Sequence, residues 1–328
     1  MSDYLWDRSG NADPEIARLE RALRVFAQPV PPPPFETRRQ RHVHRGFGTS
    51  ALLIAASLAL VVGGLVLALS LRRATPAWQL TMEGSRSTLP VGAWLDTGAS
   101  AVTMAVADIG TVTVEPGARV RLLDTRKGHH RMELARGTMH ATIWAPPNQF
   151  FVETPSTLAV DLGCAYTLTV DEDGGGLVTV LVGWVGFSTR DRESFIPAGF
   201  AAVTRPGIGP GTPYSGRTSD DYRQALARID FNPDDAGVPS ALSLVLDQSE
   251  ERDEVTLWHL LARVPRLDRD RVFDRLASFV PPPTGVTRDG IRAGDRRMLD
   301  AWWDALGLGT TSLWRTWSQQ WKEDFNRR

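Results

Sequence analysis

Histidine side chains supply many of the catalytic bases and metal ligands in proteins. His42 and His44 form an H-x-H pair, but no third metal ligand lies nearby in the sequence, so we assign the pair to a basic flank. His129 and His130 follow a Lys-Gly turn, and His140 lies in an alternating, strand-like run. No G-x-S-x-G nucleophile motif occurs. The sequence therefore predicts no catalytic centre, no metal site and no cofactor, and we expect a protein that is not an enzyme.

Three other segments contain residues that could do chemistry. The single cysteine, Cys164, lies in the apolar run 160–170, so no intramolecular disulfide is available and we expect a buried structural thiol. The acidic run 171–173 precedes three glycines but lacks the ligand spacing of a calcium loop, and it predicts a polar hairpin turn. The glycine-rich run 207–211 opens no strand–loop–helix unit, so we interpret it as a linker.

Length and charge limit the scaffold that must position these residues. A chain of 328 residues suggests about two folded units. The formal net charge of −1 creates no overall field that would attract nucleic acid, so no nucleic-acid partner is expected.

An apolar segment at residues 49–71 predicts one transmembrane helix. No charged residue occurs between Gly46 and Leu71, and about 20 helical residues span a hydrocarbon layer of about 30 Å. A buried soluble helix or a cleaved signal peptide is less favoured, because the run is apolar on every face and a long polar segment precedes it. Arginines are more numerous before the span than after it, which places the N-terminus in the cytoplasm. The basic flank is also expected to touch membrane lipid.

The N-terminal segment, residues 1–45, predicts one amphipathic helix. Asp13 is a suitable N-cap and Pro14 suits the first helical position. Such a short helix cannot bury its own apolar stripe, so it needs a partner. The expected alternative is a weakly ordered tail. The candidate partner-docking residues are Trp6, Ile16, Leu19, Leu23 and Phe26.

Residues 78–204 change to short runs that alternate with a period near two. Clear examples are 110–114, 150–153 and 177–182, with turn residues between them. Two further runs, 131–134 and 138–144, are separated by the turn signal Arg136-Gly137. Many short strands at this spacing predict an all-β sandwich, barrel or β-solenoid.

The order of the fragments in this β region resembles the FecR family of transmembrane signal regulators. The fragments are Trp94–Gly98, Val106–Val120, Leu134–Gly137, Phe151–Pro155, Val160–Leu168, Val180–Gly186 and Ile196–Ala201. Cys164 stands where the family usually has threonine, and Phe200 stands where it has glutamine. The resemblance implies a β-rich periplasmic domain, often on an anti-sigma protein, that relays an envelope signal to a cytoplasmic sigma factor.

The remainder divides into a linker at 205–218 and an all-α C-terminal domain at 219–328. Helices are predicted at 220–229, 240–246, 254–264, 268–280, 295–306 and 311–325. Five of the 11 tryptophans fall late in this domain, namely Trp302, Trp303, Trp314, Trp317 and Trp321. They are expected to form an aromatic core, with an exposed aromatic surface for a glycan, peptide or partner as the alternative.

Together these features predict a multi-domain protein of the bacterial inner membrane. It would have a cytoplasmic N-terminus, one transmembrane helix, a periplasmic FecR-like β domain and a periplasmic helical domain. The expected function is transmembrane signalling of anti-sigma type, with an extracytoplasmic-function sigma factor bound by the N-terminal segment. The alternative is an envelope scaffold that binds an extracytoplasmic protein or glycan and has no sigma partner.

Overall fold

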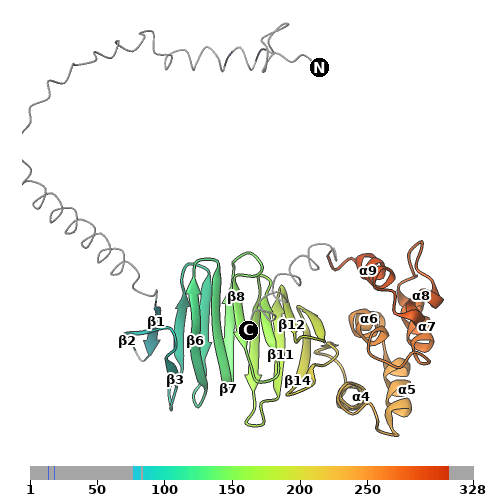
Figure 1. Ribbon diagram of the computed structural model, residues 1–328, viewed down its shortest axis with the longest axis horizontal. Coiled ribbons are helices and arrows are strands. Elements are labelled where there is room, and N and C mark those ends of the chain that lie inside the picture. Colours follow the sequence, from blue (N-terminus) through green and yellow to red (C-terminus); the bar gives the residue numbers. More distant parts are fainter. Residues whose placement is uncertain (1–13, 15–17, 19–76, 83, 310–328) are drawn as a thin grey trace, which may run out of the picture. The chain divides into compact units, whose positions relative to one another are not determined.

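The computed structural model describes Pro14, Arg18, residues 77–82 and residues 84–309 (Figure 1). The chain divides into two compact units, Met1–Leu65 and Val66–Arg328. Pro14 and Arg18 are helical and exposed. The predicted membrane segment 49–71 lies outside the described residues. Within the described residues, no helix is both long enough and apolar enough to cross a membrane.

Two sheets form the β region, and they share the long strand β7 (His129–Ile143). The first sheet also contains β1 (Trp78–Met82), β2 (Ser85–Leu89), β4 (Val102–Val106), β5 (Gly110–Val114), β10 (Ala165–Val170), β11 (Gly176–Val182), β14 (Phe200–Arg205), β15 (Gly209–Pro210) and β16 (Tyr214–Ser215). The second sheet contains β3 (Trp94–Asp96), β6 (Arg119–Arg126), β8 (Phe150–Glu153), β9 (Leu158–Asp161), β12 (Trp184–Ser188) and β13 (Glu193–Pro197). Neighbouring strands are antiparallel except β7 and β8, which run parallel.

Strand β7 passes from the second sheet to the first at Gly137. Its first half pairs with β6 and β8, and its second half pairs with β5 and β10. Gly137 has φ +92°, and a Cβ placed there would lie 2.4 Å from the Cβ of Ala118. The Arg136-Gly137 signal therefore marks a bend within one strand of 15 residues, where the sequence predicted a turn between two strands.

One apolar core fills the space between the two sheets. Met104, Met139 and Leu168 come from the first sheet, and Leu122 and Phe150 come from the second. All five are fully buried, as expected for the inward positions of alternating strands. The outward face of the first sheet is polar, with Thr81, Thr103, Thr113, His140, Thr167 and Thr179 paired across neighbouring strands in one row. This arrangement is the two-sheet form of the predicted all-β fold.

The C-terminal helices form the second core together with the outer face of the second sheet. They are α4 (Asp220–Phe231), α5 (Val238–Gln248), α6 (Glu254–Leu261), α7 (Arg269–Phe279), α8 (Arg288–Ala293) and α9 (Arg296–Ala305), and the short 3₁₀ helix η2 (Glu251–Asp253) precedes α6. Phe151, Leu158, Val160 and Phe195 of the second sheet belong to this helical core. Strands β9 and β13 are therefore buried on both faces, and the helical region is held against the sheet by shared apolar surface.

Most predicted helices are present with shifted ends, and Trp302 and Trp303 are buried as predicted. Helix α8 was not predicted. Trp314, Trp317 and Trp321 lie outside the described residues, as does the predicted helix 311–325. The predicted linker contains the short strands β15 and β16, and its residues 209–215 are buried.

Candidate functional site

A cleft of about 850 Å³ lies where the second sheet meets the helices. Its lining combines side chains from β7 and β8, the β8–β9 turn, the β12–β13 turn, the β14–β15 turn, the end of α4 and the residues after α6. The charged residues among them are Arg131, Glu153, Arg190, Asp191, Arg192, Asp230 and Arg263. Segments far apart in the sequence thus build one concave surface that combines charged and apolar side chains.

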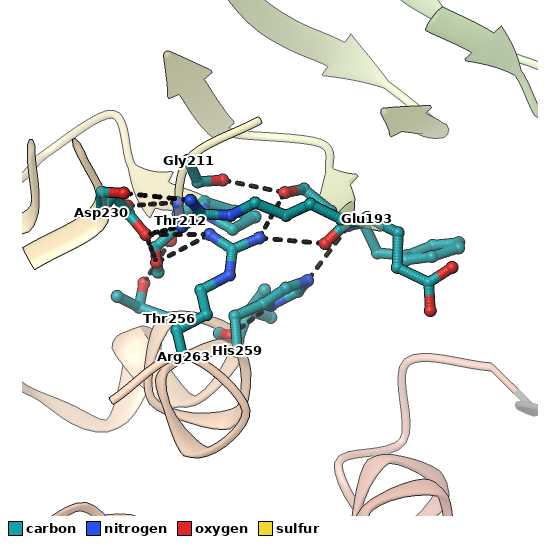
Figure 2. A network of polar contacts seen from close by, with 12 residues as sticks. Glu193, Gly211, Thr212, Asp230, Thr256, His259 and Arg263 are labelled. Atoms are coloured by element: carbon teal, nitrogen blue, oxygen red, sulfur yellow. Dashed lines mark hydrogen bonds and ion pairs between the residues drawn. The ribbon is translucent and has the colours of Figure 1, made fainter. Parts of the chain in front are cut away.

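Asp230 is the centre of a buried polar network beside this cleft (Figure 2). Its carboxylate is 2% exposed and accepts hydrogen bonds from the Thr212 backbone N–H at 2.6 Å and the Thr212 hydroxyl at 3.0 Å. Arg192 donates to Oδ1 of the same carboxylate, and Arg263 donates to that oxygen at 3.3 Å. Two guanidinium groups therefore share one carboxylate.

Arg263 joins the helical region to β13. Its Nη2 donates to the Glu193 carbonyl at 2.9 Å and to the Ser194 hydroxyl at 2.6 Å. Burial lowers the pKa of this guanidinium to about 10, while the Asp230 carboxylate acts in the opposite direction. The group therefore stays charged at neutral pH, and its charge depends on the partners in the network.

His259 of α6 lies next to this network and is neutral. Its Nε2 accepts a hydrogen bond from the Phe195 backbone N–H at 3.1 Å, and its Nδ1 donates to the Val255 carbonyl at 2.8 Å. Burial, with the nearby Arg263 charge, lowers the pKa of His259 to about 3. Its ring also lies edge-on to Trp258 and Trp303, so it serves as a core histidine that links α6 to β13.

The β8–β9 turn carries the Thr-Pro end of the FecR-like fragment Phe151–Pro155 to the cleft. The Thr154 hydroxyl accepts hydrogen bonds from the backbone N–H groups of Ser156 and Thr157, and it donates to the Thr157 carbonyl at 3.0 Å. Ser156 in turn bonds Thr204 of β14 at 2.6 Å. Side-chain bonds of this kind fix the turn, and they place its residues along the rim of the cleft.

A second buried polar group lies between β9 and β10. The Asp161 carboxylate, 2% exposed, accepts a hydrogen bond from the Gly163 N–H at 2.7 Å and another from the Cys164 thiol at 2.7 Å. Burial raises the pKa of Asp161 to about 7 and raises the pKa of the Cys164 thiol. Cys164 is thus buried as predicted, and a raised thiol pKa is the opposite of what a cysteine nucleophile requires.

Tyr166 completes that group. Its hydroxyl is buried and has no hydrogen-bond partner among the described residues. Burial raises its pKa well above its usual value, with Asp161 contributing in the same direction. A buried carboxylate, thiol and phenol therefore share a small region of the β core.

The structure places the predicted histidine and acidic segments in ordinary β positions. His129 follows the β6–β7 hairpin turn and lies 3.2 Å from Asp124, while His130 is buried. His140 bonds Thr167 and Glu115 on the exposed sheet face. The acidic run 171–173 forms the β10–β11 turn, as predicted.

The predicted docking residues are not brought into any described site. Trp6, Ile16, Leu19, Leu23 and Phe26 all lie outside the described residues. Conversely, sequence reasoning did not single out Arg192, Asp230 or Arg263. The only local signal was an aspartate between the apolar Ile229 and Phe231 near the end of a predicted helix.

The sequence matches no protein-family model and has no significant match among curated proteins. Among solved structures, two crystal structures of a "putative anti-sigma factor" from Parabacteroides distasonis are similar to part of the chain. Their identities are 14% and 15%, and both TM-scores are 0.33. The similarity covers 42% of this chain and 64% and 65% of the two solved chains, less than two thirds of either. A likeness this distant carries no argument about function, so the FecR resemblance rests on the sequence fragments.

Proposed function

We propose that this chain is a single-pass membrane regulator of anti-sigma type, with a FecR-like β domain outside the cytoplasmic membrane. In this proposal the N-terminal segment binds an extracytoplasmic-function sigma factor. The observation that carries it is the order of the segments: an amphipathic helix, an uncharged apolar run, and a β region with FecR-like fragments.

The geometry of two FecR-like fragments supports the β-domain part of the proposal. Gly163 and Gly183 belong to separate fragments, both have positive φ, and a Cβ on Gly183 would lie 2.1 Å from the Gly163 carbonyl oxygen. The contact with the backbone of the Val160–Leu168 fragment therefore requires glycine at residue 183. This physical requirement gives a reason for the glycine in the Val180–Gly186 fragment.

A regulator also needs a route by which an external event alters the rest of the chain. The helical region and the second sheet share a core, and Arg263, which pairs with Asp230 of α4, also bonds Glu193 and Ser194 of β13. A ligand or partner that binds both regions would favour one arrangement of them over others. The membrane segment would then carry that bias to residues 1–45.

The second candidate function is an envelope scaffold that binds a protein or glycan and has no sigma partner. The cleft supports it, because a ligand held there by the lining charged residues would need no cytoplasmic segment. Deletion of residues 1–45 separates the two functions. If the deletion abolishes control of the sigma factor, it supports the anti-sigma proposal. If the protein keeps all its activity in the cell without that segment, it supports the scaffold.

Topology is tested by fusing alkaline phosphatase, which is active only outside the cytoplasm, to the C-terminus of the full chain. The proposal expects an active fusion, and it expects an inactive one when the reporter is joined before residue 49. An inactive C-terminal fusion, at equal protein level, contradicts the proposed orientation.

A further inference from the structure

We propose that the cleft between the second sheet and the helices binds a small polar ligand through a carboxylate or phosphate group that pairs with Arg190 and Arg192. The cleft is the one lined by the β8–β9, β12–β13 and β14–β15 turns together with α4 and the end of α6. This proposal concerns ligand binding alone, and it holds whether or not the chain contacts a sigma factor.

The charges that line the cleft are unbalanced. Its side chains include four guanidinium groups, those of Arg131, Arg190, Arg192 and Arg263, against the carboxylates of Glu153, Asp191 and Asp230. Arg131 is paired with Glu153 at 2.6 Å. One positive charge remains in excess, so an anion would neutralise a surface that the protein leaves positive.

The imbalance is greatest near the buried network. Asp230 alone balances both Arg192 and Arg263, and its oxygens also accept two hydrogen bonds from Thr212. The Arg263 side chain is 8% exposed, whereas that of Arg192 is 20% exposed. Arg192 is therefore the member of the network that a ligand in the cleft can reach.

Arg192 keeps donors for such a ligand. A guanidinium carries five N–H donors. Among the described residues, Arg192 uses Nη1 for the Asp230 carbonyl and Nη2 for the Asp230 carboxylate. The planar fork of the remaining donors matches the two oxygens of a carboxylate or phosphate.

Arg190 supplies the second cation. It lies two residues before Arg192 on the exposed β12–β13 turn, and it makes no hydrogen bond or ion pair with any described residue. The turn itself is held in place by the Thr189 hydroxyl, which accepts from the Arg192 N–H at 3.1 Å. The β12–β13 turn thus presents two arginines to the cleft: Arg190, which has no partner among the residues the structure describes, and Arg192, which keeps unused N–H donors.

The hydroxyl groups in the lining favour an anion for a separate reason. The hydroxyls of Thr154, Thr157, Ser188 and Thr189 each donate to a backbone carbonyl of the protein. Their hydrogens are already used, so the strongest donors left for a ligand are the guanidinium groups. Acceptors remain on the hydroxyl oxygens and on the exposed Asp191, which suits hydroxyl groups elsewhere on the ligand.

The size of the cleft fits a small molecule. Pockets for small ligands usually measure about 300–1,000 Å³, and this cleft measures about 850 Å³. The combination of oxyanion donors and hydroxyl acceptors fits a sugar acid or a sugar phosphate. Both share the chemistry of an oxyanion on a polyhydroxyl frame, and the probes below distinguish them.

Isothermal titration calorimetry of the purified full chain tests the proposal with sodium glucuronate, glucose 6-phosphate and uncharged glucose as probes. We expect at least one acidic probe to bind, with glucose at least about tenfold weaker, a difference of about 1.4 kcal/mol. Arg190→Ala is expected to weaken the acidic probe by about tenfold or more. Arg217→Ala, an exposed arginine outside this cleft, is the matched control and should bind like the unaltered chain.

Preference for glucuronate assigns a carboxylate ligand, and preference for glucose 6-phosphate assigns a phosphate ligand. The proposal is overturned if neither acidic probe binds at about 10 mM. It is also overturned if glucose binds as tightly as the acidic probes. The same holds if Arg190→Ala unfolds at the same temperature as the unaltered chain and binds the acidic probe with unchanged affinity. None of these results depends on sigma-factor binding, so failure here and failure of the proposed regulatory function are distinguishable.

Discussion

Replacing the buried Asp161 by asparagine should change how the stability of the protein depends on pH. Asp161 is 2% exposed, and burial raises its pKa from an ordinary 3.8 to about 7. A carboxyl with a raised folded-state pKa contributes full stability below pH 3.8, and that contribution is lost as the pH rises through 7. Each pKa unit corresponds to about 1.4 kcal/mol, so ionisation of Asp161 costs the folded state about 4 kcal/mol at pH 8.

Asp161→Asn removes this cost and keeps the local contacts. The asparagine oxygen can still accept from the Gly163 N–H, and its amide can donate to the Cys164 sulfur. The free energy of unfolding, measured in urea, should match the unaltered chain near pH 4 and exceed it by about 4 kcal/mol near pH 8. Asp234→Asn, at an exposed position, is the control and should show no such trend. A difference between Asp161→Asn and the unaltered chain that stays constant from pH 4 to 8 would refute the reasoning.

Three further predictions concern the helical region and the bend in β7. The pKa of His259 is lowered to about 3, so the unfolded state binds a proton more readily and the unfolding free energy should fall by about 3 kcal/mol between pH 7 and pH 4. In His259→Gln, urea unfolding should not show that fall. Asp230→Asn leaves two guanidinium groups without their shared carboxylate, so it should lower the unfolding free energy by about 3–5 kcal/mol. Arg296→Ala, which breaks an exposed ion pair, should lower the unfolding free energy by less than about 1 kcal/mol, and equal losses for Asp230→Asn and Arg296→Ala would contradict this prediction. Gly137→Ala should lower the melting temperature more than Gly207→Ala, because a Cβ at residue 137 would collide with Ala118 whereas a Cβ at residue 207 would meet no atom within 4 Å. A larger decrease for Gly207→Ala would contradict this prediction.

The sequence predicted two strands with their observed ends: β5, where buried and solvated residues alternate, and β8, a short apolar run whose residues contact both cores. The runs 110–114 and 150–153 were predicted with the bounds that β5 and β8 have in the structure. Strand β2 was not identified, because four of its five residues are exposed and no alternation results. Strand β13 was not identified as a separate strand, because helices cover its outer face, four of its five residues are buried, and its polar and apolar residues do not alternate.

The bend at Gly137 shows why connectivity is harder to predict than strand content. An Arg-Gly pair between two alternating runs is the usual signal of a turn. Here the chain continues in the same direction and changes sheets, because Gly137 fits closely against Ala118. Only the tertiary contact distinguishes a bend from a hairpin.

The candidate cleft could not be predicted from the sequence. Its charged residues range from Arg131 to Arg263, and each looks like an ordinary surface residue in its own segment. The buried position of Asp230 depends on Thr212, Arg192 and Arg263, which come from three other segments. A site assembled by long-range contacts leaves no local spacing pattern.

Co-purification of the full chain from its native cells tests whether the N-terminal segment, residues 1–45, binds a sigma factor. We expect an extracytoplasmic-function sigma factor to co-purify with the unaltered chain and with Arg18→Ala. We expect the sigma factor to be lost from Leu19→Asp/Leu23→Asp, which would place charges on the predicted apolar stripe. Recovery of no sigma factor, or equal recovery with the aspartate variant, would contradict the claim.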